Sequence, residues 1–173
     1  MKILPDRFEI RQARMIVDDR CEFLSAIQSI ARECSTHIIC FNAENMAGHR
    51  HVKAALQYAK RSFFSGKPIS NSFEMEALLF AAGTRQCNIA ALFGIHENEN
   101  VVFVCSCPVN GNVWEELSHH MHFVNEAWDE ITPEKEERLK SFFSITREEL
   151  ALVGSERIVD LVLERIALLE VYR

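Results

Sequence analysis

The sequence predicts an α+β protein, a single domain over residues 1–173 with a few strands, mostly helices and one hydrophobic core. Two kinds of pattern lead to this prediction. Short apolar runs typical of buried strands lie at 38–41 and 101–105, and longer stretches repeat apolar residues every three or four positions, as helices do. The length of 173 residues, with 48% hydrophobic and 25% charged residues, is ordinary for one globular domain.

The first part of the chain is expected to alternate strands and helices. A strand at 8–17 precedes a helix that runs to about residue 33, and Asp19 with Glu22 three positions later marks the start of that helix. A second strand at 38–41 is followed by a polar loop. The clearest amphipathic helix spans 49–64, and its core stripe contains Val52, Ala55, Leu56, Ala59 and Phe63.

Helices dominate the rest of the predicted structure. Asn71, with Glu74 three positions later, is expected to cap a buried helix that Gly83 ends in a left-handed conformation. The nearly continuous apolar run at 101–105 predicts a central strand. Further helices are expected at about 84–93 and 114–128, from Pro133 after Thr132, after Thr146, and at 155–171.

Composition and cysteine usage indicate the compartment. No apolar run reaches the roughly 20 residues that a membrane span needs, and Pro5 and Asp6 interrupt the start of the chain before a signal sequence can form. The 6 cysteines include no Cys-x-x-Cys pair, and a disulfide framework is unusual in a mid-sized chain without an export signal. The protein is therefore expected to be cytoplasmic, with reduced and mostly buried thiols.

Sequence motifs of catalysis are lacking. The chain has no phosphate-binding glycine loop and no Gly-x-Ser-x-Gly elbow. An alternative, a metal-dependent enzyme, rests on His119, His120 and His122 with Cys105 and Cys107 nearby, because imidazole and thiolate bind zinc. Adjacent helical residues diverge by about 100°, which favours an exposed polar helix segment over a metal site.

Charge is unevenly distributed along the chain. The net charge of −6 argues against a nucleic-acid partner, yet no acid occurs from Asn45 to Phe73, and acids gather from Glu115 to Glu149. The acid-free stretch carries five cations: Arg50, Lys53, Lys60, Arg61 and Lys67. Like charges three or four residues apart on a helix repel. These cations therefore form either a solvated helix face or a surface that binds phosphates.

The predicted last helix has apolar residues on more than one face, among them Ile158, Leu161, Val162 and Leu168. Such a helix is usually deeply buried. The alternative is a helix that packs one face on the core and offers another to a partner protein.

Three blocks between residues 38 and 94 closely resemble the small, non-catalytic subunit of the KEOPS (EKC) complex, the PRPK-binding protein or Cgi-type family. They are CFNA at 40–43, RHVKAA at 50–55 and SFEMEALLFAAGTRQ at 72–86. The block at 74–86 is specific to that family, and the matching blocks cover about a third of the chain. Departures are Asn42 in place of the commoner acid, Phe80 in place of tyrosine and Ala82 in place of serine.

The resemblance implies a small, mostly antiparallel sheet packed with about seven or eight helices. It also implies a subunit without catalysis or a cofactor of its own, which binds the Bud-type (PRPK) kinase and captures tRNA by its 3′ CCA end for threonylcarbamoyladenosine modification. An associated Kae-type subunit performs catalysis. A CCA end offers unpaired bases and a few phosphates, which cations and an apolar platform can bind. The expected RNA-binding residues are Arg50, His51, Lys53, Lys60, Arg61, Phe64, Lys67, Ile69 and Arg85.

Three further expectations accompany this resemblance. Glu74 is expected to cap its helix, and Glu76 to hold Arg85 or a neighbouring amide, rather than to contact RNA. The kinase is expected to bind the last helix at Ile158, Leu161, Val162 and Leu168. A subunit that binds the kinase as a scaffold or regulator, without any contact to RNA, remains the main alternative.

Overall fold

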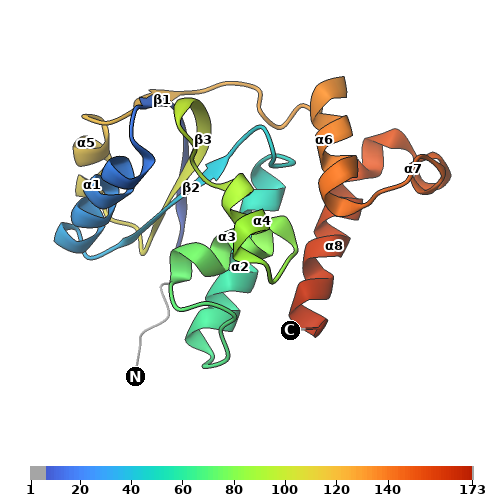
Figure 1. The fold of residues 1–173 in the computed structure, drawn as a ribbon, viewed down its shortest axis with the longest axis horizontal. Helices are drawn as coiled ribbons and strands as arrows, with labels where there is room; N and C mark the ends of the chain where they lie inside the picture. The colour runs from blue at the N-terminus through green and yellow to red at the C-terminus, as the bar shows by residue number, and fades with distance from the viewer. Residues whose placement is uncertain (1–6, 173) are drawn as a thin grey trace. The chain divides into compact units, whose positions relative to one another are not determined.

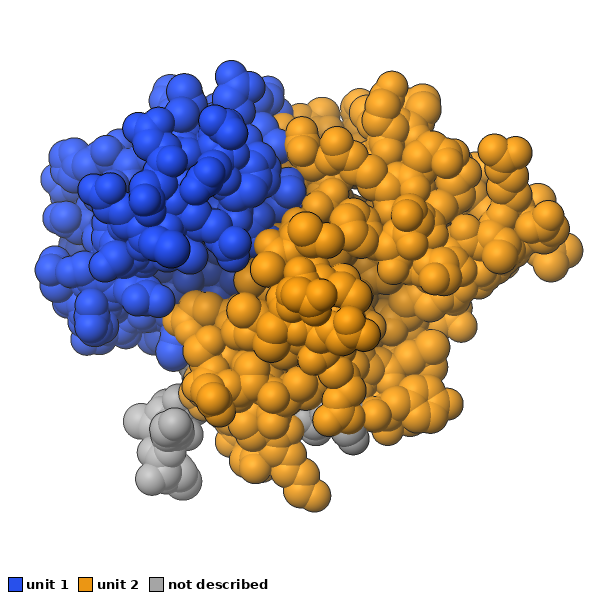
Figure 2. All heavy atoms as spheres, viewed as in Figure 1, with its two compact units in different colours: residues 1–42, 94–126 blue, residues 43–93, 127–173 orange. Residues whose placement is uncertain are grey.

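The computed structural model describes residues 7–172. Pro5 and Asp6, on which the argument against a signal sequence rests, lie outside these residues. The chain divides into two compact units, each built from two separate segments (Figure 2). Unit 1 contains the chain up to Asn42 and residues 94–126, and unit 2 contains residues 43–93 and the chain from Ala127 onward.

Unit 1 is a four-stranded antiparallel sheet with two helices (Figure 1). The strands run in the order β2-β3-β1-β4. Their bounds are β1 Glu9–Val17, β2 His37–Asn42, β3 Asn98–Cys107 and β4 His122–Val124, and the helices are α1 Arg20–Glu33 and α5 Asn112–Leu117. β3 is paired on both sides, by β1 and β2, which confirms the central position that its apolar run predicts.

One face of this sheet forms the core of unit 1. Ala13, Met15 and Val17 alternate along β1 toward this face, where they meet buried residues of β3, and Ala13 lies directly opposite Val102. α1 contributes Ile27 and Ile30, and α5 contributes Val113, Trp114 and Leu117. The period of two along the strand and of three to four along the helices is what brings these apolar side chains to one layer.

Unit 2 is built of helices. They are α2 His49–Phe64, α3 Phe73–Ala82, α4 Cys87–Ala90, η1 Ala91–Phe93, α6 Pro133–Phe143, α7 Arg147–Val153, η2 Ser155–Arg157 and α8 Ile158–Tyr172. α2 packs against both α3 and α8. α3 is apolar over much of its circumference, and Ala77, Leu79 and Phe80 are fully buried on it, as predicted for a buried helix.

The helix ends follow local capping chemistry. Thr132 and Thr146 cap α6 and α7 by accepting hydrogen bonds from Lys135 N and Glu149 N, and the two helices begin where the sequence predicts. Gly83 ends α3 at φ 62°, as predicted. The predicted cap at Asn71 is wrong: Ser72 caps α3 by accepting a hydrogen bond from Met75 N at 3.1 Å.

The predicted helix at 114–128 is also wrong. α5 ends at Leu117, and His122–Val124 instead form β4, an edge strand paired with β1 through Ala13 and Phe123. Phe123 packs edge-on against Trp114 at 5.7 Å between ring centroids. The helix at 84–93 is likewise shorter than expected, because α4 begins only at Cys87.

The α+β prediction is confirmed. Residues 7–172 contain one four-stranded antiparallel sheet and eight α-helices. None of the helices within these residues is both long and apolar enough to span a bilayer. Whether residues 1–173 behave as a single folding domain remains a prediction.

Candidate nucleic-acid interface

The cations of α2 share one side of the helix. At about 100° per residue, Arg50, Lys53, Lys60 and Arg61 lie within about 100° of its circumference, opposite the buried Val52, Ala55, Leu56 and Ala59. We refer to Arg50, Lys53, Lys60 and Arg61 as the α2 cationic face. The spacing that buries one side of the helix therefore also gathers the charge on the other.

The four members of the α2 cationic face differ in their surroundings. Lys53 and Arg61 are exposed, and Lys60 is half-buried. The Arg61 guanidinium lies over the Tyr58 ring, 4.9 Å from its centroid, which fixes its direction. Arg50 donates to Asp160 Oδ1 of α8 at 2.9 Å, so part of its charge is neutralised. Hydrogen bonds from Arg50 and then Arg157 lower the pKa of Asp160.

The loop after α2 carries the apolar part of the expected RNA site. Lys67 is exposed and Ile69 is half-buried. The Phe64 ring is half-buried too and packs against Phe63 and Phe73, with centroids 5.3 Å and 5.5 Å apart. Only part of the Phe64 ring is therefore open to a stacking base.

His51 does not belong to this surface, which corrects the expectation that it supplies charge to RNA. Its side chain is fully buried. Nδ1 accepts a hydrogen bond from Ala47 N at 3.0 Å, and Nε2 donates to Ala81 O at 2.8 Å. Burial lowers the pKa of His51 to about 4, so the ring is neutral at physiological pH. The helical spacing contained this signal, because His51 lies four residues before the core residue Ala55.

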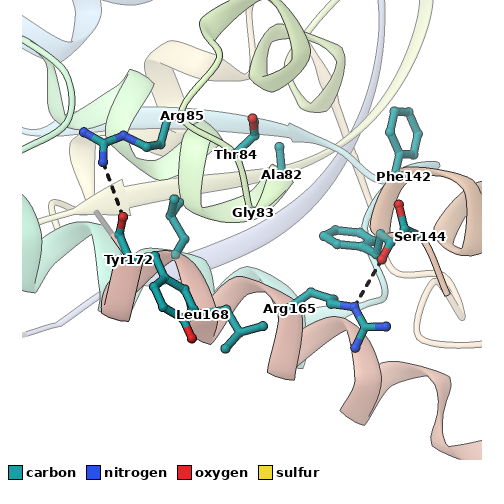
Figure 3. Close-up of a pocket in the computed structure, with 11 residues that line it drawn as sticks. Ala82, Gly83, Thr84, Arg85, Phe142, Ser144, Arg165, Leu168 and Tyr172 are labelled. Carbon is teal, nitrogen blue, oxygen red and sulfur yellow. Dashed lines mark hydrogen bonds between the residues drawn. The ribbon is translucent and has the colours of Figure 1, made fainter.

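Arg85 lies beside the C-terminal end of α8 rather than on the α2 cationic face (Figure 3). It lines a pocket of about 450 Å³ with residues of α3, α6 and α8. Its Nη1 donates to the carbonyl oxygen of Tyr172 at 3.4 Å. In the same pocket Arg165 Nε donates a hydrogen bond to the carbonyl oxygen of Phe143 at 3.2 Å. Arg165 Nη2 donates hydrogen bonds to both carboxylate oxygens of Glu149.

Glu76 holds neighbouring amides, the second of its two expected roles. It is fully buried, and it accepts hydrogen bonds from the backbone N–H groups of Ile69 and Ser70.

Three of the four expected kinase-binding residues lie in the core. Ile158, Leu161 and Val162 are between 0% and 6% exposed, because they face the interior of unit 2, so the expectation that they contact a partner is wrong for them. Leu168 is 41% exposed. Its neighbours Val171 and Tyr172, which are 70% and 75% exposed, were not among the residues predicted to bind the kinase. Their position at the end of an apolar helix was the feature of the sequence from which they could have been predicted.

The residues of the metal-site alternative do not converge. His119, His120 and His122 are exposed, while Cys105 and Cys107 are fully buried. Burial raises the pKa of Cys105 well above its usual range, which disfavours the thiolate that binds zinc. In the part of the chain that the structure describes, no three His, Cys, Asp or Glu side chains are grouped to hold a metal ion.

Comparison with known proteins identifies a relative. No family model matches the chain. Regulatory protein Cgi121 of Methanocaldococcus jannaschii is 31% identical to it over 130 residues, which cover 75% of this chain and 80% of that protein. At this identity and coverage, the chain belongs to the Cgi121 family.

Proposed function

We propose that this chain is a non-catalytic, regulatory subunit of a cytoplasmic KEOPS complex. In this role it binds the Bud-type kinase subunit and recruits tRNA through the 3′ CCA end for threonylcarbamoyladenosine modification. Two findings support the proposal: the relationship to a protein described as regulatory, and the α2 cationic face, which is the observation that carries the RNA-binding part.

The geometry of α2 suits a short single strand. Phosphates are bound by cations that point the same way, and Lys53 and Arg61 are both exposed on the α2 cationic face. Lys53 forms no ion pair with another residue in the described range 7–172. Lys67, Ile69 and the open part of Phe64 follow at the end of the helix and can meet unpaired bases. The net charge of −6 repels RNA from the chain on average, so RNA capture requires a local cationic surface such as this one.

The exposed end of α8 is the surface that we assign to the kinase. Leu168, Val171 and Tyr172 place apolar side chains in water, and apolar residues at the centre of an interface supply most of its affinity. Of the residues expected from the sequence to bind the kinase, only Leu168 belongs to this surface, because the core already uses the other three.

The direct test compares tRNA with an intact CCA end and the same tRNA without it, across a salt series. Salt-sensitive binding that is lost with the CCA end supports the recruiting role, since each phosphate contact to a single strand contributes about 0.7 to the salt slope. Equal and negligible binding to both tRNAs would reject autonomous tRNA capture. The chain would then be a kinase-binding scaffold without RNA contact.

A further inference from the structure

One buried carboxylate organises the loop between α2 and α3. Glu76 Oε1 accepts hydrogen bonds from Ile69 N at 3.0 Å and from the Ser62 hydroxyl, and Oε2 accepts one from Ser70 N at 2.8 Å. The Ser70 hydroxyl lies 3.0 Å from the same Oε2. Two backbone N–H groups and two hydroxyls thus converge on a side chain that is fully buried. Charge-assisted hydrogen bonds of this kind are about twice as strong as neutral ones.

The groups that Glu76 holds adjoin the residues expected to meet RNA. Ser62 follows Arg61 on α2, and Ile69 is itself one of the apolar residues of the proposed surface. Lys67 lies two residues before Ile69, and its carbonyl oxygen is 3.4 Å from the Ser62 hydroxyl. The carboxylate therefore connects the last turn of α2, the loop and α3, and the path of the loop depends on it.

We propose that Glu76 is a positioning residue of the RNA surface. Its carboxylate sets the loop so that Lys67 and Ile69 face the CCA end, and Glu76 itself stays buried and does not contact RNA. This inference rests on the proposed function.

An electrostatic effect of Glu76 and a positioning role of Glu76 predict opposite changes in RNA binding when this carboxylate is removed. A negative charge near several cations weakens their attraction for phosphate, so its loss by electrostatics alone strengthens RNA binding. Glu76→Gln also removes one of the two acceptor oxygens and replaces it with an NH2 donor. The backbone N–H groups of Ile69 and Ser70 then compete for one oxygen, and the loop loses its fixed path.

The experiment measures binding of wild type, Glu76→Gln and the matched control Glu74→Gln to tRNA with and without the CCA end. Glu74 carries the same charge two residues earlier on α3. We expect Glu76→Gln to bind intact tRNA about tenfold more weakly, with no change for truncated tRNA, and Glu74→Gln to bind as tightly as wild type or more tightly. Faster hydrogen exchange at the Ile69 and Ser70 amides is expected for Glu76→Gln alone. Intact-tRNA binding by Glu76→Gln at wild-type strength or above would overturn the inference.

The outcomes separate this inference from the proposed function. Wild type that does not distinguish the two tRNAs rejects the proposed function, and the positioning role with it. Wild type that distinguishes them, with Glu76→Gln equal to it, rejects the positioning role alone. If Glu76→Gln fails to fold, as judged by thermal unfolding, Ser62→Ala serves instead because it removes one donor to the carboxylate. Several-fold weaker binding of intact tRNA by Ser62→Ala supports the inference, and unchanged binding overturns it.

Discussion

His51 shows how one buried side chain couples stability to pH. Its pKa is lowered by burial to about 4, from 6.5 when exposed. Between these two pH values the His51 ring is protonated in the unfolded chain but not in the native state. The free energy of unfolding therefore falls as the pH drops from about 6.5 toward 4, and the contribution of His51 is fully present above that window. One pKa unit corresponds to about 1.4 kcal/mol, and we expect His51 to account for a loss of about 3 kcal/mol across it.

Urea unfolding of wild type and His51→Gln at several pH values between 7.5 and 4.5 measures this contribution. The variant is less stable at pH 7.5, because glutamine cannot keep both ring hydrogen bonds, but its stability is expected to change less with pH. Parallel pH curves for the two proteins would contradict the assignment. A nuclear magnetic resonance titration supplies a second check, since the His51 ring is expected not to titrate between pH 7 and 5.

Gly48 combines a left-handed backbone with a close neighbour. Its φ is 95°, and a Cβ there would lie 2.5 Å from Asp129 Oδ1. The same oxygen accepts a hydrogen bond from His49 N at 2.7 Å, and thus caps α2 where Gly48 offers no side chain. Gly48→Ala is expected to lower the free energy of unfolding by about 3 kcal/mol, from backbone strain and loss of this cap.

Gly66→Ala is the matched control for this change. Gly66 has a φ of 93°, but a Cβ added to it would have no atom within 4 Å, so only backbone strain of about 1 kcal/mol is expected. Chemical denaturation of both variants gives the difference, which reports the contact with Asp129. Equal losses for the two variants would show that Asp129 moves aside without cost.

At the scale of single elements, α2 carries the clearest functional prediction. Lys53→Glu with Arg61→Glu reverses two exposed charges of the α2 cationic face, and we expect at least tenfold weaker binding to CCA-intact tRNA. The salt slope is expected to fall by about 0.7 for each lost phosphate contact. Filter binding across a salt series measures both quantities. The control is Arg20→Glu, which reverses the charge of an exposed residue on α1 and is expected to bind tRNA like wild type.

Elements with one strong period were predictable from the sequence, and those with mixed signals were not. The bounds of α2 were predicted correctly because its apolar and charged stripes both repeat at helical spacing. The region 114–128 failed because Trp114, Leu117 and Met121 fit a helix, while the pairing of Phe123 with β1 depends on a strand far away in the sequence. Tertiary pairing of this kind overrides local propensity.

The same distinction holds for the candidate site. The sequence placed Lys53 and Arg61 on one helix face, and the structure agrees. It gave no sign that Asp160 pairs with Arg50 or that Arg85 lies beside Tyr172, because residues that meet across a long stretch of chain leave no local pattern. Partner residues on α8 were assigned by apolarity alone, which does not distinguish a core position from an exposed one.

For the molecule as a whole, the proposed function requires two separate binding surfaces, so that mutations in one abolish binding of one partner only. The proposed RNA surface lies on α2 and the loop that follows it, while Leu168 and Val171 lie at the end of α8. Leu168→Glu with Val171→Glu places two charges on the surface assigned to the kinase, and charges at the centre of an apolar interface are costly to bury. We therefore expect this variant to lose most of its affinity for the kinase subunit and to retain its affinity for tRNA.

The reverse pattern is expected for Lys53→Glu with Arg61→Glu on α2, which should lose affinity for tRNA and retain affinity for the kinase subunit. Leu152→Glu serves as the control for α8, because Leu152 is 88% exposed on α7 and is expected to affect neither partner. Calorimetry with the kinase subunit and filter binding with tRNA complete the four-way comparison. Loss of both partners in either variant would mean that the surfaces overlap or that the fold is damaged, and circular dichroism separates these two causes. Independent losses would establish a chain that joins kinase and tRNA through different helices, as an adaptor without chemistry of its own must do.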